Sequence, residues 1–355
     1  MSGALIELVA KGVQDIYLLD DDLSSSLFQS VFEKHTNFSQ APRRLDFNGQ
    51  TPSSGSSSSI ILKSYGDLVN YMWLEGTNLT DYLPGTVIDL YIGGQKIDSH
   101  TFEYLSEAWQ PYLAETYSKS AIINNGWTAS AKNFLPLHFF FCDLHSYIPL
   151  IALQYHEVEI RILWGSLIGG CSDIIPYANY IYLDTKERDF MANNTTELLI
   201  TQVQRYTFPA AQGSIDLSFL NHPVRTLFFG IEATTLTDVF TFTEGSLQIN
   251  GTEVFNKMSP LYFHVVQSFY HTDNAVISWN RRSNNRPNIT LLYMYNFCLN
   301  ATSYRSTGSV NFSRIDNAKI SLTNVSTTKT TGVVYAVSYN VLKIQNGLGG
   351  ILFGN

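Results

Sequence analysis

One phrase with the pattern of a β-hairpin occurs twice in this chain. Leu90 to Ile97 and Leu247 to Val254 both place a Gly-Gly or Asn-Gly turn between apolar residues, and they lie 157 residues apart. Two further pairs of segments share an offset of 156 residues: those that end at Cys142 and Cys298, and those that begin at Leu68 and Val224. Self-similarity at one spacing is the signature of a repeated unit, so the sequence predicts a duplicated domain of about 155 residues.

Length and composition agree with two packed domains. The chain has 355 residues, which fits two domains of ordinary size. Aromatic residues make up 14% and charged residues 15%, which excludes the disordered class, where low hydrophobicity and high charge prevent a core. The formal net charge of −8 disfavours a general attraction to nucleic-acid phosphates or anionic membranes, so we expect no direct nucleic-acid binding.

Cysteine usage and the first residues favour a cytosolic setting. Cys142, Cys171 and Cys298 have no CxxC spacing and leave an odd count, which argues against a disulfide framework and against a zinc cluster. We expect buried thiols in a reducing compartment. Charged residues interrupt the first 19 positions, so no signal peptide is expected. No apolar run approaches the roughly 18 residues needed to span a bilayer.

Asn-x-Ser/Thr sequons are frequent in the chain. They begin at Asn37, Asn78, Asn193, Asn194, Asn250, Asn288, Asn300, Asn311 and Asn324. Such sites usually mark surface loops of secreted proteins. A chain rich in Asn, Ser and Thr produces sequons freely, so most are expected to be unmodified. The candidate glycosylation sites are Asn78, Asn250, Asn288 and Asn300.

Strand patterns dominate the first half of the chain. We expect strands over 60–74, 134–142, 152–164 and 179–183, with the hairpin 87–97 adding two more. Alternation over 152–164 predicts a strand with one wetter face. The charged residues 184–189 are predicted to be a connector.

Two helices are expected. Residues 5–19 show a partly amphipathic pattern, which predicts a short helix or a terminal arm that docks on a neighbour, or equally a helix that packs on its own domain. Apolar residues recur at the helical period over 102–112, with Asp98-Ser99 as the expected N-cap and Pro111 as a limit on the helix length.

The second half repeats the scheme of short strands. The predicted strands are 198–208, 224–232, 239–242, 246–254, 261–269, 275–279, 289–299, 310–312, 318–322 and 332–344. Many short strands separated by turn residues, with almost no helical period, indicate antiparallel sandwiches or barrels.

Several long motifs resemble the major capsid proteins of nucleocytoplasmic large DNA viruses. The best-known signature is FLPLHFFFC at 134–142 followed by IPLIALQYHEVEI at 148–160. Further matches are LVAKGVQDIYL at 8–18, HTNF at 35–38, IGGQKID at 92–98, LDTKER at 183–188 and NFSRIDNA at 311–318. The motifs keep the family's order and extend to Gly349-Gly350, so the resemblance covers essentially the whole chain.

The resemblance implies an all-β fold of two tandem eight-stranded antiparallel jelly rolls, a double jelly roll with few short helices. It places an N-terminal arm at 1–24, the first jelly roll at 25–186, a linker at 187–197 and the second jelly roll at 198–355.

The function that the resemblance implies is structural. Two jelly rolls in each of three chains give a homotrimeric, pseudo-hexagonal capsomer that tiles the icosahedral shell of a large double-stranded DNA virus. The expected partners are further copies of the chain, neighbouring capsomers and minor capsid proteins, reached through side faces and the N-terminal arm. Some of the 21 tyrosines are expected in trimer contacts. The expected location is the virion, after assembly in the host cytoplasm.

Two alternatives remain beside this interpretation. The chain is compact for the family, with short loops at 78–85 and 302–308, which is also compatible with a minor paralogous double jelly-roll subunit. The other alternative is a carbohydrate-binding tandem β-sandwich. Its candidate stacking residues are Trp73, Trp109 and Trp127.

Residue patterns give little support to catalysis, metal binding or cofactor binding. Glu157 and Glu159 share a predicted strand face, as glycosidase carboxylates can, but such pairs are common on solvated strands. Four candidate ligands lack the spacing of a metal site: His138, Asp143, His145 and His156. No phosphate-binding loop or nucleophile elbow is present. We therefore predict no enzyme activity, no metal and no cofactor.

One basic cluster stands out near the middle of the second half. It consists of Arg281, Arg282 and Arg286, next to Trp279. Nucleic-acid binders usually show a basic face rather than a single basic loop, so a solvated loop or a subunit contact is the expected role.

Overall fold

The computed structural model describes residues 3–17, 34–116, 119, 132–143, 145–233, 237–273, 281–283, 286–288, 291–303 and 305–354. The chain divides into two compact units, Met1–Asn37 and Phe38–Asn355. The first unit contains helix α1 (Gly3–Val9) and the 3-10 helix η1 (Val13–Tyr17), so the helical prediction for 5–19 is confirmed as far as Tyr17. The expected boundary between residues 24 and 25 lies outside the described residues.

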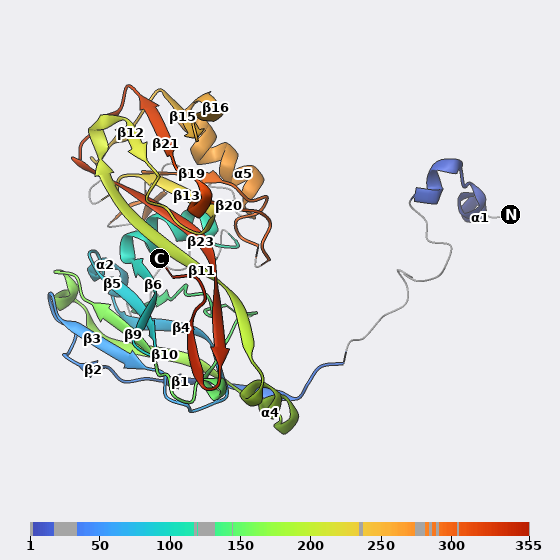
Figure 1. Ribbon diagram of the computed structural model, residues 1–355, viewed down its shortest axis with the longest axis vertical. Helices are drawn as coiled ribbons and strands as arrows, with labels where there is room; N and C mark the ends of the chain where they lie inside the picture. The colour runs from blue at the N-terminus through green and yellow to red at the C-terminus, as the bar shows by residue number, and fades with distance from the viewer. Residues whose placement is uncertain are drawn as a thin grey trace. The chain divides into compact units, whose positions relative to one another are not determined.

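The second unit begins with a sandwich of antiparallel strands, coloured blue to green in Figure 1. Its strands are β1 (Phe38–Arg44), β2 (Asn48–Gly49), β3 (Ser57–Ile61), β4 (Leu68–Thr77), β5 (Val87–Ile92), β6 (Gln95–Thr101), β7 (Lys132–Pro136), β8 (Ile148–Pro149), β9 (Val158–Leu163) and β10 (Ser172–Leu183). One sheet has the order β1-β10-β4-β7, with β8 on β4, and the other has the order β2-β3-β9-β5-β6. Short helices connect them: α2 (Leu79–Tyr82), η2 (Tyr104–Leu113), η3 (Leu150–Ala152) and η4 (Ile168–Gly170).

A second sandwich, yellow to red in Figure 1, follows helix α4 (Thr185–Asn193). Its main strands are β11 (Thr196–Pro209), β12 (Ser214–Asp216), β13 (Pro223–Gly230), β15 (Glu244–Ile249), β16 (Thr252–Met258), β19 (Leu292–Asn296), β21 (Ala318–Thr323) and β23 (Thr331–Gln345). The sheets have the orders β11-β23-β13-β19 and β12-β21-β15-β16.

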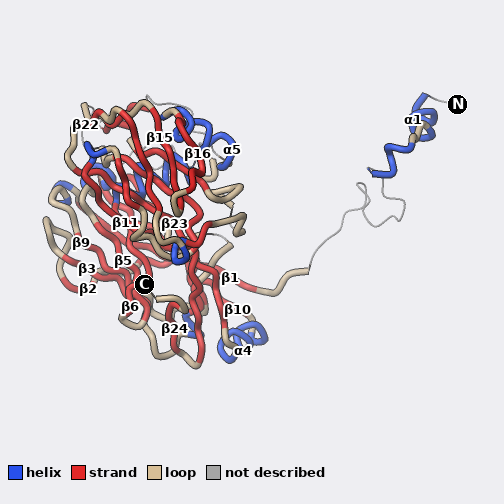
Figure 2. Tube along the Cα trace, turned by 45° about the horizontal axis from the view of Figure 1, so that its top comes forward, coloured by secondary structure: helices blue, strands red, loops and turns tan. Residues whose placement is uncertain are grey.

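Smaller elements complete the second sandwich. The short strands are β14 (Phe240–Thr241), β17 (Arg281–Ser283), β18 (Arg286–Asn288), β20 (Val310–Asn311), β22 (Ser326–Thr327) and β24 (Leu348–Ile351). The short helices are η5 (Ala210–Gln212), η6 (Tyr262–Val266), α5 (Gln267–His271) and η7 (Phe312–Arg314). Strands are the most abundant secondary structure of the described residues, as the tube in Figure 2 shows in red.

The two sandwiches have the same strand order, which confirms the duplication. The order β1-β10-β4-β7 corresponds to β11-β23-β13-β19, and β3-β9-β5-β6 corresponds to β12-β21-β15-β16. The repeated phrase forms the hairpins β5–β6 and β15–β16. Each sandwich therefore has two facing four-stranded sheets at its centre, and the predicted all-β double jelly roll is confirmed.

The backbone conformation of the turn residues explains why both jelly rolls contain this hairpin. Gly93 and Gly94 have φ angles of 57° and 81°, and Asn250 and Gly251 have 48° and 80°. Two consecutive positive φ angles define the tight turn whose twist matches that of the flanking strands, and Gly and Asn tolerate it best.

The sheet β11-β23-β13-β19 is buried on both faces. Leu227 and Phe229 of β13 belong to the core of the second jelly roll, whereas Phe228 between them belongs to a cluster with the first. On β23, Val334 and Ala336 face the second core, and Tyr335 faces the first jelly roll. This sheet therefore serves as a shared wall. Its strands β13, β19 and β23 are largely apolar because both of their faces are covered, whereas the edge strand β11 keeps exposed residues.

Three predicted strands of the first half are longer than the observed ones. The stretch 60–74 is interrupted by a loop between β3 and β4, and β7 ends at Pro136. The following aromatic run turns back, with Cys142 N–H donating to the carbonyl of Phe139 at 2.8 Å, and places Phe139 and Phe141 in the core. Residues 152–157 precede β9 as a turn, whose Tyr155 N–H donates to the Gly347 carbonyl at 3.0 Å. In the aromatic run after β7 and in the residues before β9, tertiary contacts thus take the place of the predicted strand pairing.

Two predictions that concern helices need correction as well. Residues 261–269 were predicted to be a strand, but they form the helices η6 and α5. The expected cap Asp98-Ser99 lies inside β6, and Thr101 Oγ1 instead accepts from the Tyr104 N–H at 3.2 Å. Pro111 lies within η2, because η2 is a π-helix whose wide turn accommodates the ring, and the helix ends at Leu113.

The second half otherwise follows its predicted strands closely. The connector 184–189 is mostly helix α4, capped by Asp184, whose side chain accepts from the Thr185 N–H at 2.8 Å. The predicted strand 275–279 lies outside the described residues.

The glycines of the first hairpin provide a stability test. A Cβ on Gly93 would lie 2.3 Å from His156 Nδ1, whereas one on Gly94 meets nothing within 4 Å. We expect Gly94→Ala to cost about 1 kcal/mol through backbone strain alone. Gly93→Ala should cost at least about 1 kcal/mol more, because His156 must move. Urea unfolding of both variants measures the difference, and equal costs would contradict the clash.

Candidate functional site

The contact between the jelly rolls is built around helix η2. Tyr112 is fully buried against Phe228 of β13, with ring centroids 5.5 Å apart. Its hydroxyl donates to the Leu292 carbonyl at 2.6 Å and lies 2.5 Å from His264 Nδ1. Burial raises the pKa of Tyr112 and lowers the pKa of His264 to about 4, so both groups are neutral at physiological pH.

A second part of the contact joins β6 to β11. Asp98 Oδ1 accepts from the backbone N–H of Val203 at 2.9 Å, and the other carboxylate oxygen lies 3.0 Å from His100 Nε2. Gln202 Nε2 donates to the Ile97 carbonyl. Asp98, His100 and Gln202 are all buried. Buried polar groups with fixed partners allow one alignment of the two strands, because any slip would leave them unsatisfied.

A third part is a cluster of carboxylates at the end of β13. Glu107 of η2 accepts from the Ala233 N–H at 3.0 Å. Glu232 accepts from the Tyr335 hydroxyl and from Arg205 Nη2, the latter at 3.0 Å. Burial raises the pKa of Glu107 well above its ordinary value, and Glu232 and Glu103 raise it further, while Lys329 lowers it.

The β23–β24 hairpin forms the fourth part. His156 Nδ1 of the first jelly roll lies 2.9 Å from the Gly349 carbonyl and 3.1 Å from its N–H. Together with Tyr155 and Gly347, this contact fixes the far end of β23 to the first sandwich. The jelly rolls are therefore held at four places along the shared wall.

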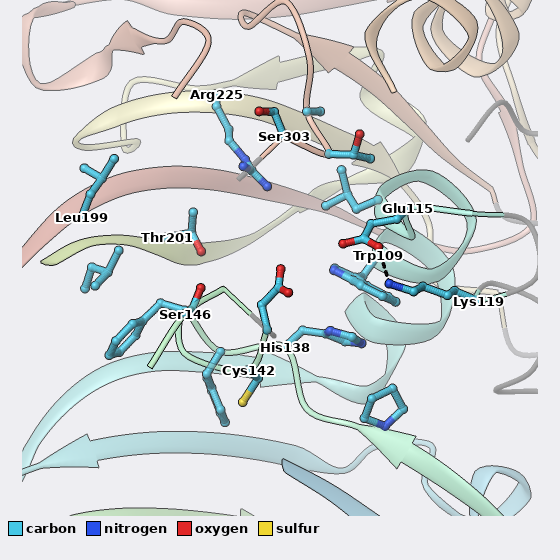
Figure 3. A pocket seen from close by; sticks show the side chains of 18 of the residues that line it. Trp109, Glu115, Lys119, His138, Cys142, Ser146, Leu199, Thr201, Arg225 and Ser303 are labelled. Carbon is cyan, nitrogen blue, oxygen red and sulfur yellow. Dashed lines mark hydrogen bonds and ion pairs between the residues drawn. The ribbon is translucent and has the colours of Figure 1, made fainter. Parts of the chain in front are cut away.

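A pocket of about 390 Å³ opens beside this contact (Figure 3). In Figure 3, His138, Cys142 and Ser146 come from the first jelly roll and face Arg225 and Ser303 of the second. Burial raises the pKa of the Cys142 thiol to about 12 and lowers the pKa of His138. The thiol is thus protonated and His138 is neutral, stacked on Trp109 with centroids 3.3 Å apart. Neither group is poised for nucleophilic or acid–base chemistry.

The predicted catalytic and metal candidates do not assemble into a site. Glu159 pairs with Arg161 at 2.7 Å, which lowers its pKa, and Glu157 precedes β9. Among the described residues, no group of three or more His, Cys, Asp or Glu side chains is placed to hold a metal ion. In the same part of the chain, no helix has the length and apolar character needed to cross a membrane.

The candidate glycosylation residues differ in their surroundings. Asn78 and Asn250 are exposed in turns, and Asn250 Oδ1 accepts from the N–H groups of Asp316 and Asn317. Asn300 is half-buried, and its Nδ2 donates to Asp273 at 2.9 Å, so a glycan there would replace that bond. Asn288 lies on β18.

The aromatic and basic candidates are separated. Trp73 lies on β4, stacked on Tyr177 with centroids 5.0 Å apart, whereas Trp109 lines the pocket and Trp73 does not. Trp127 and Trp279 lie outside the described residues. The three arginines lie on the β17–β18 hairpin.

Sequence reasoning missed the contact residues of the shared wall, above all Tyr112, Glu107 and Tyr335. The available signal was the unbroken apolar run on β23, which is typical of a strand buried on both faces.

Two tyrosines of β23 provide a matched test of the contact. The Tyr335 hydroxyl donates to Glu232 and lies 3.0 Å from Thr101 Oγ1, whereas the buried Tyr339 hydroxyl has no hydrogen-bond partner among the residues that the structure describes. We expect Tyr335→Phe to cost about 1.5–3 kcal/mol, the range for a hydrogen bond to a charged group. Tyr339→Phe should stay within about 0.5 kcal/mol of the parent. Denaturant unfolding compares them, and similar losses would refute the assignment.

The raised pKa of Glu107 predicts a pH dependence. Since the folded chain holds this proton to higher pH than the unfolded chain, the contribution of Glu107 to stability is full below its ordinary pKa of 4.5 and is lost as pH rises through the raised value. Glu107→Gln keeps an acceptor for the Ala233 N–H. It should raise the melting temperature at pH 8 and leave it nearly unchanged at pH 4.5.

Glu159→Gln is the control for this pH test, because the pKa of Glu159 is lowered and its contribution has the opposite sign. That variant should lose stability at pH 8 relative to the parent. Melting curves between pH 4.5 and 8 decide, and a parallel shift of Glu107→Gln at every pH would contradict the prediction.

Comparisons with known proteins agree with this architecture. The family model described as large eukaryotic DNA virus major capsid protein matches residues 187–350, and the model for the major capsid protein N-terminus matches residues 26–169. The major capsid protein of Pyramimonas orientalis virus is 33% identical, and that of Paramecium bursaria Chlorella virus 1 is 28% identical; each alignment covers 100% of both chains.

Solved structures show the same fold. The chain from the PBCV-1 virus capsid superimposes with a TM-score of 0.77 at 24% identity, over 93% of this chain and 100% of that one. The Faustovirus major capsid protein gives a TM-score of 0.69 at 11% identity over 96% of both chains. The chain therefore belongs to the major capsid protein family of nucleocytoplasmic large DNA viruses, as its motifs predicted, and it is a structural protein of the virion capsid rather than an enzyme.

Proposed function

We propose that three copies of this chain form a pseudo-hexagonal capsomer that tiles the icosahedral shell of a large double-stranded DNA virus. The observation that carries the proposal is the pair of sandwiches with one strand order, held together along a shared wall. Two similar lobes per chain make a ring of three chains six-lobed. Such a tile fits the sixfold positions of a shell while each chain keeps identical contacts.

The expected partners are two further copies within the capsomer, then neighbouring capsomers and minor capsid proteins. Trimer contacts bury more surface than lattice contacts, so we expect a stable trimer and weak association between trimers. We place the N-terminal arm at 1–24, the jelly rolls at 25–186 and 198–355, and the linker at 187–197. The end of β10 at Leu183 and the start of β11 at Thr196 support the last boundary. Assembly in the host cytoplasm is part of the same proposal.

A minor paralogous subunit would have the same fold but would occupy few positions. Quantitative mass spectrometry of purified virions separates the two roles, because a principal subunit must be the most abundant shell protein. The same spectra test glycosylation at Asn78, Asn250, Asn288 and Asn300. Asn78 and Asn250 are exposed, which makes them better acceptors than the half-buried Asn300.

The trimer itself is testable on the purified chain. Light scattering at micromolar concentration should give three times the chain mass of 39.9 kDa, and electron microscopy should show six-lobed outlines with threefold symmetry. A monomer without such outlines would count against the proposal. A glycan array that binds this monomer would favour the carbohydrate-binding alternative, in which Trp73 or Trp109 stacks on sugar.

A further inference from the structure

The duplicated fold allows a comparison of the outer faces of two equivalent sheets. In the second jelly roll, Arg205, Tyr335 and Phe228 lie directly opposite one another on β11, β23 and β13. In the first, Arg44, Tyr177 and Trp73 lie directly opposite one another on the corresponding β1, β10 and β4. Both outer faces thus carry a row of an arginine, a tyrosine and a large aromatic residue.

The two rows differ in what covers them. Phe228 and Tyr335 are 0% and 1% exposed, because Tyr112 and Tyr104 of helix η2 pack on them at centroid distances of 5.5 Å and 5.3 Å. Trp73 and Tyr177 are only half-buried and stack on each other. Tyr71 adds a third ring, 5.9 Å from Trp73. Within the described residues, no helix occupies on this face the place that η2 takes on the other.

The helix that covers the second sheet also has an equivalent. Helix η2 follows β6, and η6 with α5 follows β16 at the corresponding place in the second jelly roll. Counted from the start of each π-helix, Tyr262 corresponds to Tyr104 and Tyr270 to Tyr112. Tyr112 is fully buried, whereas Tyr270 is 73% exposed and its neighbour Phe269 is 63% exposed.

The strands beside these helices show the same contrast. Residues Asp98 and His100 of β6 are buried where β6 runs along β11. Strand β16 occupies the equivalent edge, and all its residues are exposed or only partly buried. The second jelly roll therefore presents exposed aromatic residues of α5 and an exposed strand β16 where the first jelly roll uses η2 and β6 to bind its neighbour.

We propose that α5 of one copy, through Phe269 and Tyr270, packs on the outer face of β4 and β10 of the next copy, at Trp73 and Tyr177. The contact between copies repeats the contact that η2 makes with Phe228 and Tyr335 inside the chain. The inference rests on the proposed trimer and names the surfaces that form it.

The geometry favours a closed ring. The contact is head-to-tail, since a helix of one copy meets a sheet of the next, and such contacts either close or continue as a filament. Three copies with two lobes each close a six-lobed ring when every packing step, within a chain and between copies, turns by one sixth of a revolution. Tyrosine and tryptophan are the residues that most often dominate interface energy, and both exposed sides carry them.

Substitutions on either side should dissolve the trimer. Tyr270→Glu and Trp73→Glu each remove an aromatic anchor and place a charge in the contact, so each should raise the dissociation constant of the trimer at least about 30-fold. The control is Phe190→Glu, because Phe190 of α4 is 65% exposed and lies outside both surfaces. Sedimentation equilibrium reports the mass, and circular dichroism confirms that each variant is folded.

A crosslinking experiment keeps the inference testable if a variant does not fold. Replacement of Tyr270 by p-benzoylphenylalanine retains an aromatic ring, and irradiation of trimers mixed from isotopically light and heavy chains identifies crosslinks between copies. The expected products join residue 270 of one copy to the β4 or β10 peptide of another. Crosslinks elsewhere, or trimers that persist in both glutamate variants, would overturn the contact while leaving the trimer intact. A monomeric parent chain would overturn the trimer and the contact together.

Discussion

The architecture depends on one sheet that is buried on both faces. Sheet β11-β23-β13-β19 contributes Leu227 and Phe229 to its own core and Phe228 to a contact with the first jelly roll. A β-sandwich ordinarily exposes the outer faces of its sheets to water, so this second burial is what converts two sandwiches into one body. The orientation of this sheet then sets the angle between the two jelly rolls. A six-lobed capsomer requires that this angle be the same in every chain.

Apolar burial alone would not fix that angle, because apolar contacts are weakly directional. The polar partners inside the wall supply direction. Tyr112, Asp98 and Gln202 each form a hydrogen bond with one backbone group of the other jelly roll. A different alignment that breaks these bonds would leave buried groups without partners, at a cost of about 1–3 kcal/mol for each. Packing therefore provides the stability, and the hydrogen bonds select one arrangement.

The sequence predicted what depends on local pattern. The duplication, the two hairpins and most strands of the second jelly roll follow from turn residues and alternation, which act over a few positions. Helix α5 was missed because its apolar run resembles a strand, although the repeat offset maps it onto η2, where a helix was expected. The contact of Tyr112 with Phe228 could not be inferred in the same way, because it joins residues 116 positions apart through tertiary packing. Tertiary packing also explains why residues 152–157 do not form the predicted strand. The backbone N–H of Tyr155 donates to the Gly347 carbonyl of the β23–β24 hairpin instead of to a neighbouring strand.

Duplication explains why the two outer faces have diverged in character. On the face with Phe228, the aromatic residues of β13 and β23 are covered within the chain and buried. The face with Tyr71, Trp73 and Tyr177 must be tolerated by water while the chain is alone, and stacked amphipathic rings are suited to both states. All three residues are half-buried, so their rings still offer area to a partner. The residues on each outer face thus fit the way in which that face is covered: by the same chain during folding, or, in the proposed contact, by another copy during assembly.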